Sequence, residues 1–196
     1  MDIVLIRHPA VSVEEGVCYG QSDVALADPP EASAAAVAVR LATLQVPAPR
    51  VLLSSPLTRC ATVATALAAN FGCAYSIDDS LKEMDFGTWE LQRWDDIDRA
   101  SLDAWAQDFH GARAHGGENV EQFVGRVRAW FDAFQQTREL TPAYIVTHAG
   151  VMRVIAAGVL GLPVERCLKW SLDMSSCVWL SRDDASGEWS LVRWNA

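Results

Sequence analysis

The sequence predicts an α/β fold of three α/β/α layers around a mainly parallel sheet. Two apolar runs rich in β-branched residues, 1–6 and 143–147, have the pattern of buried parallel strands. Along the chain, such strands alternate with segments of helical periodicity, which is typical of a sheet covered by helices on both faces. No repeat, low-complexity segment or linker divides the chain, so we expect one domain over residues 1–196.

A long loop is predicted after the first strand, over residues 9–27, where glycines and polar residues replace the apolar pattern. A helix is then expected from Asp28 to about Leu44. Asp28 is a candidate cap, Pro29 suits the first helical position, and Glu31 completes the spacing of a capping box.

The middle of the chain predicts a strand at 50–54, a helix at 58–70 and a short strand at 74–77. Residues 78–117 follow no regular period and are expected to form an irregular insert that acts as a lid.

The last part predicts a helix, a strand, a helix and a hairpin. Asn119 and Gln122 have the spacing of a helix cap, and apolar residues keep helical spacing from there to Phe134. The elements after the strand at 143–147 are a helix over Gly150–Leu160, stopped by Gly161 and Pro163, and a C-terminal β-hairpin of Ser176–Ser181 and Trp189–Trp194.

Composition limits the classes of function. The chain is 51% hydrophobic and 21% charged, as in globular proteins, and its net charge of −9 argues against a nucleic-acid surface. It has neither a signal-peptide pattern nor an apolar stretch near the roughly 20 residues of a membrane span, so we expect a cytoplasmic protein without membrane contact. Five cysteines without a CxxC pair indicate reduced thiols: Cys18, Cys60, Cys73, Cys167 and Cys177.

Chemistry-bearing side chains stand where the chain leaves the predicted strands. Arg7 and His8 follow the first strand, Arg59 begins the helix after the second, Glu83 comes shortly after the third, and His148 follows the fourth. The carboxyl ends of parallel strands meet at one edge of a sheet, so these side chains are expected to converge there.

Such a set is suited to phosphate chemistry without a metal. A neutral imidazole is a competent nucleophile near pH 7, and arginine forks bind phosphate oxygens. A second, protonated histidine adds donors where charge develops, and a nearby glutamate can protonate a leaving oxygen and then deprotonate water.

Each residue taken alone also has a structural interpretation. Arg59 suits a solvated helix position, and Glu83 is one of several neighbouring acids. The tryptophans of the insert suit packing better than a substrate wall: Trp89, Trp94 and Trp105. His110 and His115 lie in polar sequence, where we expect surface residues, and no histidine pair has a metal-ligand spacing.

Taken together, these residues resemble the histidine phosphatase superfamily, whose fold is phosphoglycerate mutase-like. The similarity covers nearly the whole chain. Its motifs are Leu5–His8, Ser54–Cys60, Leu81–Glu90, Gly116–Asn119 and Val146–Val151.

The resemblance implies a role for each candidate. His8 would be the phosphorylated nucleophile, Arg7, Arg59 and His148 would hold the phosphate oxygens, and Glu83 would be the general acid and base. It implies no metal and no organic cofactor, and a small phosphorylated metabolite as the partner.

Two segments look most like the α-ribazole phosphatase branch, which removes the 5′-phosphate of α-ribazole phosphate in cobalamin assembly: Gly16–Asp23 and Glu83–Glu90. In that branch the insert tryptophans would offer an apolar wall to the benzimidazole base, and Gln21 would touch substrate or phosphate.

The chain departs from the family pattern at several positions. Pro9 replaces the glycine that usually follows Arg-His and has no amide hydrogen to donate, and Leu91 replaces a common glycine. Ala10 and Val11 stand where polar residues are usual, and the glycine and glutamine that usually open the first helix are absent from 28–36.

Alternative functions stay open at this point. A broad-specificity histidine phosphatase or a phosphoglycerate mutase would use the same phosphohistidine, and a non-catalytic phosphate-binding module is a third reading. The sequence predicts no oligomeric state.

Overall fold

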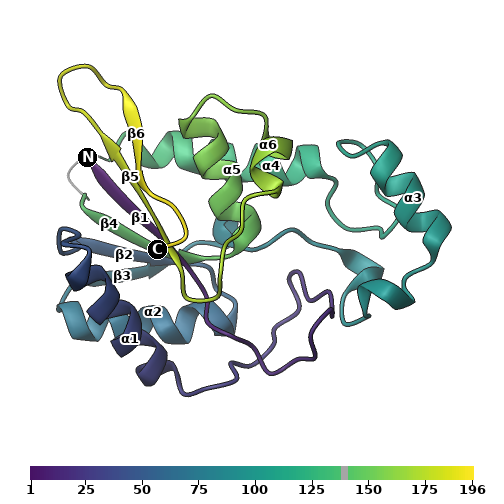
Figure 1. Cartoon of the computed structure of the whole chain (residues 1–196), viewed down its shortest axis with the longest axis horizontal. Coiled ribbons are helices and arrows are strands. Elements are labelled where there is room, and N and C mark those ends of the chain that lie inside the picture. Colours follow the sequence, from purple (N-terminus) through teal and green to yellow (C-terminus); the bar gives the residue numbers. More distant parts are fainter. Residues whose placement is uncertain (138–140) are drawn as a thin grey trace.

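The protein is described by a computed structural model over residues 1–137 and 141–196. Within these residues a six-stranded sheet has the order β3-β2-β4-β1-β5-β6 (Figure 1). The strands are β1 (Asp2–Arg7), β2 (Val51–Ser54), β3 (Ala74–Ile77), β4 (Ala143–Thr147), β5 (Cys177–Arg182) and β6 (Trp189–Arg193).

Strands β1 to β4 pair in parallel. β5 pairs antiparallel with β1, and β6 pairs antiparallel with β5. Arg7 of β1 pairs with Thr147 of β4, and Ser54 of β2 pairs with Val146. The residues that follow these three strands therefore leave the sheet side by side at one edge. β5 and β6 form the predicted C-terminal hairpin and extend the sheet beyond β1.

Helices cover both faces of the sheet, as the alternating pattern predicts (Figure 1). One face carries α1 and α2, and the other carries α4, α5 and α6, whereas α3 lies away from the sheet. The helices are α1 (Pro30–Thr43), α2 (Thr58–Phe71), α3 (Arg99–Gln107), α4 (Val120–Phe134), α5 (Ala149–Val159) and α6 (Val164–Leu168).

Strand β1 shows why its sequence is apolar throughout. Ile3 and Leu5 pack in the core beneath α4 and α5, whereas Val4 and Ile6 pack in the core beneath α1 and α2. A strand buried on both faces has no polar alternation, so its apolar run is explained by its place in the sheet. None of the helices in the described ranges is long and apolar enough to cross a membrane.

Helix caps agree with the sequence in one place and differ in another. Asn119 and Gln122 form the capping box of α4. Asp28 does not cap α1, because Pro29 takes the cap position without a side-chain hydrogen bond and Pro30 begins the helix.

The insert 78–117 contains more regular structure than its sequence predicts. It holds α3, capped by the Asp98 side chain, and three 3₁₀ turns, Asp79–Leu81, Gly87–Trp89 and Trp94–Asp96. Leu102 and Trp105 of α3 pack against the core but are only partly buried, and a helix of 9 residues gives its apolar face little length to show in the sequence. The five-residue α6 was also not predicted, because a single short turn leaves little periodicity.

Leu91 in the insert adopts a left-handed backbone with φ of 65°. Only glycine takes this conformation without steric cost, which agrees with the glycine that the family resemblance leads us to expect at this position.

Candidate active site

The strand exits open into a cavity of about 620 Å³. Arg7, His8 and Glu83 line it together with Arg153 of α5, which was not among the predicted site residues. The rest of the wall is largely apolar and includes Val11, Val17, Tyr19, Phe86, Trp94 and Met174, but two acids, Glu14 and Glu15, also line it. The site therefore combines a charged floor with a rim that is mostly apolar and carries negative charge at these two positions.

One ring nitrogen of His8 is hydrogen-bonded to the backbone, and the other carries a lone pair that can react. The Pro9 carbonyl lies 2.7 Å from Nδ1, and because a carbonyl only accepts, Nδ1 carries the proton. The lone pair is then on Nε2. Burial, followed by the charge of Arg59, lowers the pKa of His8 from 6.5 to about 3, so the ring is neutral at pH 7.

His148 lies beside His8, with the two ring centroids 5.2 Å apart. It is completely buried, and its Nε2 lies 2.9 Å from the Ser55 hydroxyl oxygen and 3.5 Å from the sulfur of Cys60. Burial holds its pKa well below 6.5, and His8 and Arg59 add to that effect. His148 is therefore neutral at pH 7, which differs from the protonated second histidine expected from the sequence. An incoming phosphate dianion would raise this pKa again.

Arg59 is fully buried. The alternative that it is a solvated helix residue is therefore wrong. Its Nη1 donates to the Ser22 carbonyl at 2.8 Å and its Nη2 to the Gly20 carbonyl at 2.5 Å. The guanidinium carbon lies 5.0 Å from the centre of the Tyr19 ring. Arg59 therefore fixes the loop 9–27 as well as placing positive charge next to His8.

In the described part of the chain, three arginines each have a buried N–H donor without a hydrogen-bond partner. Arg7 donates from Nη1 to the Leu172 carbonyl, and Arg153 donates from Nη2 to the Trp170 carbonyl at 3.0 Å. In both, and in Arg59, the buried Nε has no hydrogen-bond partner in the described part of the chain. Buried unpaired donors are costly in a finished structure, and anionic oxygens would satisfy them.

Arg153 had one signal in the sequence. It is an arginine inside α5, an otherwise apolar helix that begins immediately after His148. Burial lowers its pKa, and the nearby Glu83 carboxylate opposes that effect.

Glu83 is half-buried and is held by the start of α5. Its Oε2 accepts from the Gly150 amide at 3.0 Å, and its Oε1 accepts from the Met84 amide at 3.0 Å. A side chain at Gly150 would overlap the Glu83 carboxylate, so glycine is required for this close approach. The positive end of the helix also favours a carboxylate at this point.

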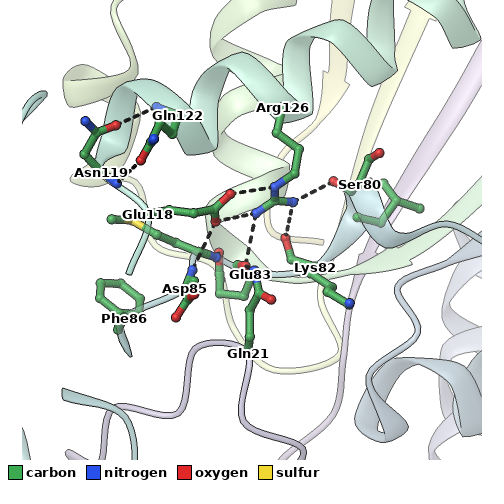
Figure 2. A network of polar contacts seen from close by, with 12 residues as sticks. Gln21, Ser80, Lys82, Glu83, Asp85, Phe86, Glu118, Asn119, Gln122 and Arg126 are labelled. Carbon is green, nitrogen blue, oxygen red and sulfur yellow. Dashed lines mark hydrogen bonds and ion pairs between the residues drawn. The ribbon is translucent and has the colours of Figure 1, made fainter. Parts of the chain in front are cut away.

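A network around Arg126 of α4 fixes the backbone that carries Glu83 (Figure 2). Arg126 forms a 2.6 Å ion pair with Glu118 and donates to the carbonyls of Lys82 at 3.0 Å and Glu83 at 3.2 Å. Glu118 in turn accepts from the Asp85 amide at 3.1 Å. Glu118 lies in the motif Gly116–Asn119, whereas Arg126 belongs to none of the motifs and was not predicted.

Gln21 belongs to this network and does not line the cavity. Its side-chain amide donates to the Glu83 carbonyl at 3.0 Å (Figure 2). The neighbouring carboxylate of Glu90 accepts from the amides of Gln21 at 2.8 Å, Ser22 at 2.6 Å and Phe86 at 3.0 Å, which ties the loop to the insert. Contact of Gln21 with substrate stays a prediction.

The aromatic residues of the insert pack on one another. Trp89 is buried with Cys18 and Ile97, and its ring contacts those of Trp94 and Trp105. His110 is exposed as expected, but His115 is not a surface residue. It is fully buried, its ring centre lies 4.8 Å from that of Trp89, and its Nδ1 accepts from the Gly117 amide.

All five cysteines are free, as expected. Burial raises the pKa of Cys18 to about 12 and raises that of Cys60 as well, so both are thiols at neutral pH. Residues 1–137 and 141–196 hold no group of three or more histidine, cysteine or acidic side chains placed to bind a metal ion.

Known proteins resemble this chain over half to all of its length. It is 29% identical to a glucosyl-3-phosphoglycerate phosphatase of Mycolicibacterium vanbaalenii, over 98% of this chain and 91% of that protein. It is 31% identical to an adenosylcobalamin/alpha-ribazole phosphatase of Salmonella typhimurium, over 55% of this chain and 54% of that protein. The crystal structure of the alpha-ribazole phosphatase from Shigella flexneri superposes with a TM-score of 0.88 at 23% identity, covering 100% of this chain and 96% of that one.

The family profile described as histidine phosphatase superfamily (branch 1) matches residues 3–196. That range includes five strands and all of β1 except its first residue, as well as His8, His148 and the insert. The chain therefore belongs to the histidine phosphatase superfamily, and it is a phosphatase.

Proposed function

We propose that this phosphatase hydrolyses phosphate monoesters without a metal, through a phosphohistidine on His8. The observation that supports this most directly is the state of the His8 ring. It is neutral, its Nδ1 is committed to the Pro9 carbonyl, and it lines the cavity beside unpaired arginine donors. A neutral imidazole with one fixed tautomer is ready to attack from the other nitrogen.

In the first step, Nε2 of His8 attacks phosphorus in line with the ester bond. The phosphorus–nitrogen bond forms, the bond to the ester oxygen breaks, and a protonated Glu83 gives its proton to that oxygen. In the second step Glu83 takes a proton from water, the water oxygen attacks phosphorus, and the phosphorus–nitrogen bond breaks. Inorganic phosphate and neutral His8 remain, and Glu83 is protonated again.

Arg7, Arg59 and His148 bind the phosphate oxygens in this proposal. The buried Nε groups of the two arginines satisfy their missing hydrogen bonds on those oxygens. His148 takes up a proton as the anion enters, because the negative charge offsets the arginines that lower its pKa.

The substrate we propose is α-ribazole 5′-phosphate, which would place the enzyme in the cytoplasm, late in cobalamin assembly. Support comes from the Salmonella typhimurium relative and from the apolar side chain of Phe86, which lines the cavity next to Glu83. The full-length mycobacterial relative makes glucosyl-3-phosphoglycerate the first competitor.

The test compares kcat/KM for α-ribazole 5′-phosphate, glucosyl-3-phosphoglycerate, 3-phosphoglycerate and p-nitrophenyl phosphate in the presence of EDTA. We expect full turnover under these conditions and a clear preference for α-ribazole 5′-phosphate. Inhibition by EDTA would contradict the metal-free mechanism, and a preference for glucosyl-3-phosphoglycerate would overturn the substrate.

The intermediate is tested separately with ³²P-labelled substrate and rapid acid-free quenching. Label should appear on histidine in the wild type and be absent in His8→Ala, whose turnover is lost while its circular dichroism is retained. Undiminished turnover in His8→Ala would mean that another group is the nucleophile.

A further inference from the structure

A second, smaller cavity of about 190 Å³ lies next to the catalytic one, between the insert and helices α4, α5 and α6. The two cavities share Glu83, Phe86 and Arg153 as lining residues. The small cavity therefore begins where the carboxylate of Glu83 is held against α5.

The charge in this cavity is confined to the shared end. Glu83 and Arg153 are the charged members of its lining, and the remaining lining residues are apolar. They include three aromatic rings and two aliphatic side chains from three helices and the segment after α3, namely Trp105, Phe109, Phe123, Val124 and Leu168. An apolar chamber with a polar entrance is the usual form of a small-molecule site.

The position of Glu83 decides which part of a substrate meets this chamber. If Glu83 protonates the leaving oxygen, that oxygen lies within hydrogen-bond distance of its carboxylate. The alcohol attached to the oxygen then starts at the junction of the two cavities. Phosphate remains on the His8 side, and the far end of the alcohol can enter the small cavity.

Size and polarity define what fits. Sites for drug-sized ligands run to about 300–1,000 Å³, so a chamber of 190 Å³ suits one flat ring system rather than a second sugar. Trp105 also carries a buried indole N–H with no partner among the described residues, which a ring nitrogen or oxygen would satisfy.

We propose that this chamber is the leaving-group subsite, and that it selects phosphate esters whose alcohol ends in a flat, apolar ring. Arg153 stands at its entrance and binds the polar linker between the ring and the ester. This assignment rests on the phosphatase function proposed above. The ring then lies in the chamber lined by Trp105 and not at the loop-side rim of the catalytic cavity, which is lined by Trp94.

The test uses two esters of the same primary alcohol position, α-ribazole 5′-phosphate with the ring and ribose 5-phosphate without it. The ratio of their kcat/KM values isolates the ring, because phosphate and ribose are common to both. Burial of one aromatic ring predicts a wild-type ratio of about tenfold or more.

Val124→Phe fills the chamber from α4, and Trp105→Ala removes one wall. We expect both to bring the ratio at least about tenfold closer to one. Trp94→Ala, the matched aromatic control on the other cavity, should keep the wild-type ratio. Ribose 5-phosphate turnover in each variant reports whether the catalytic side is still folded.

The outcomes separate the subsite from the proposed function. Turnover of both esters with a wild-type ratio near one overturns the subsite and leaves the phosphatase mechanism standing. A ratio lost in Trp94→Ala but kept in Val124→Phe places the ring on the loop-side rim and also overturns it. Absence of turnover and of phosphohistidine with either ester contradicts the proposed function itself.

Discussion

The two sides of the catalytic cavity are built in different ways. On the sheet side, Arg59 and His148 are completely buried and arrive by the geometry of parallel strands. On the insert side, Glu83 is half-buried in a segment of turns, and its position depends on hydrogen bonds from Gly150, Arg126 and Gln21. The sheet places phosphate-binding groups through its core, whereas the insert places the acid through dedicated polar contacts.

The largest effect that separates the two sides is expected from Glu83→Gln. The amide keeps the shape of the side chain but cannot transfer a proton, so kcat should fall by about two to four powers of ten. Binding of inorganic phosphate, measured as product inhibition, should change little because the sheet side is intact. A loss of phosphate affinity as large as the loss of kcat would contradict this division.

A smaller loss is expected from Arg126→Met, which removes the donors to the Lys82 and Glu83 carbonyls and leaves Glu118 unpaired. Misplacement of an acid by a fraction of an ångström to 1 Å predicts a fall in kcat of about tenfold to a hundredfold.

The control for Arg126 is Arg128→Met, an exposed arginine two residues along α4. It should have wild-type kcat. If Arg126 merely stabilises the fold, its variant will lose phosphate affinity and thermal stability in proportion to kcat, and the acid-dependent limb of the pH–rate profile will not move.

The sheet side should also dominate the pH dependence of stability. Burial lowers the pKa of His8 and His148 in the folded protein, whereas the unfolded chain protonates them near pH 6.5. Their contribution is therefore complete above pH 6.5 and is lost as pH falls, for His8 down to about pH 3. Each ring should lower the free energy of unfolding by up to about 1.4 kcal/mol per pH unit.

Urea unfolding between pH 7 and pH 5.5 measures this slope. His8→Asn and His148→Asn should each reduce it, because one differential proton is removed. Equal slopes in the wild type and both variants would show that the two rings are as easily protonated in the folded protein as in the unfolded chain.

The smallest effect concerns the backbone of the insert. Leu91→Gly relieves a left-handed backbone, worth about 1–2 kcal/mol, but raises the entropy of the unfolded chain. A net gain of roughly 0.5–1 kcal/mol is expected in thermal unfolding. Gly87→Ala, at φ of 49°, should do the reverse, since its side chain would overlap the His115 carbonyl. A stabilising Gly87→Ala would refute the argument from φ.

The sequence predicted the sheet side well because local patterns determine it. Apolar strands end at Arg7 and Thr147, and parallel pairing then brings His8 and His148 together. The insert was harder, because α3 is short and its core-facing residues, Leu102 and Trp105, are only partly buried. His115 is buried by contacts with Trp89 and Gly117 rather than by any period in its own sequence. Arg153 and Arg126 were missed because single arginines on helices usually face water.

The insert also shares a small apolar core with the loop 9–27, formed by Cys18, Trp89 and Ile97, in addition to the two cores that flank the sheet. Mutations around this third core can accumulate in evolution without disturbing the strands that carry the histidines. Substrate preference and hydrolytic chemistry are thus free to diverge at different rates within one gene, and directed evolution of new specificity should begin in residues 86–109.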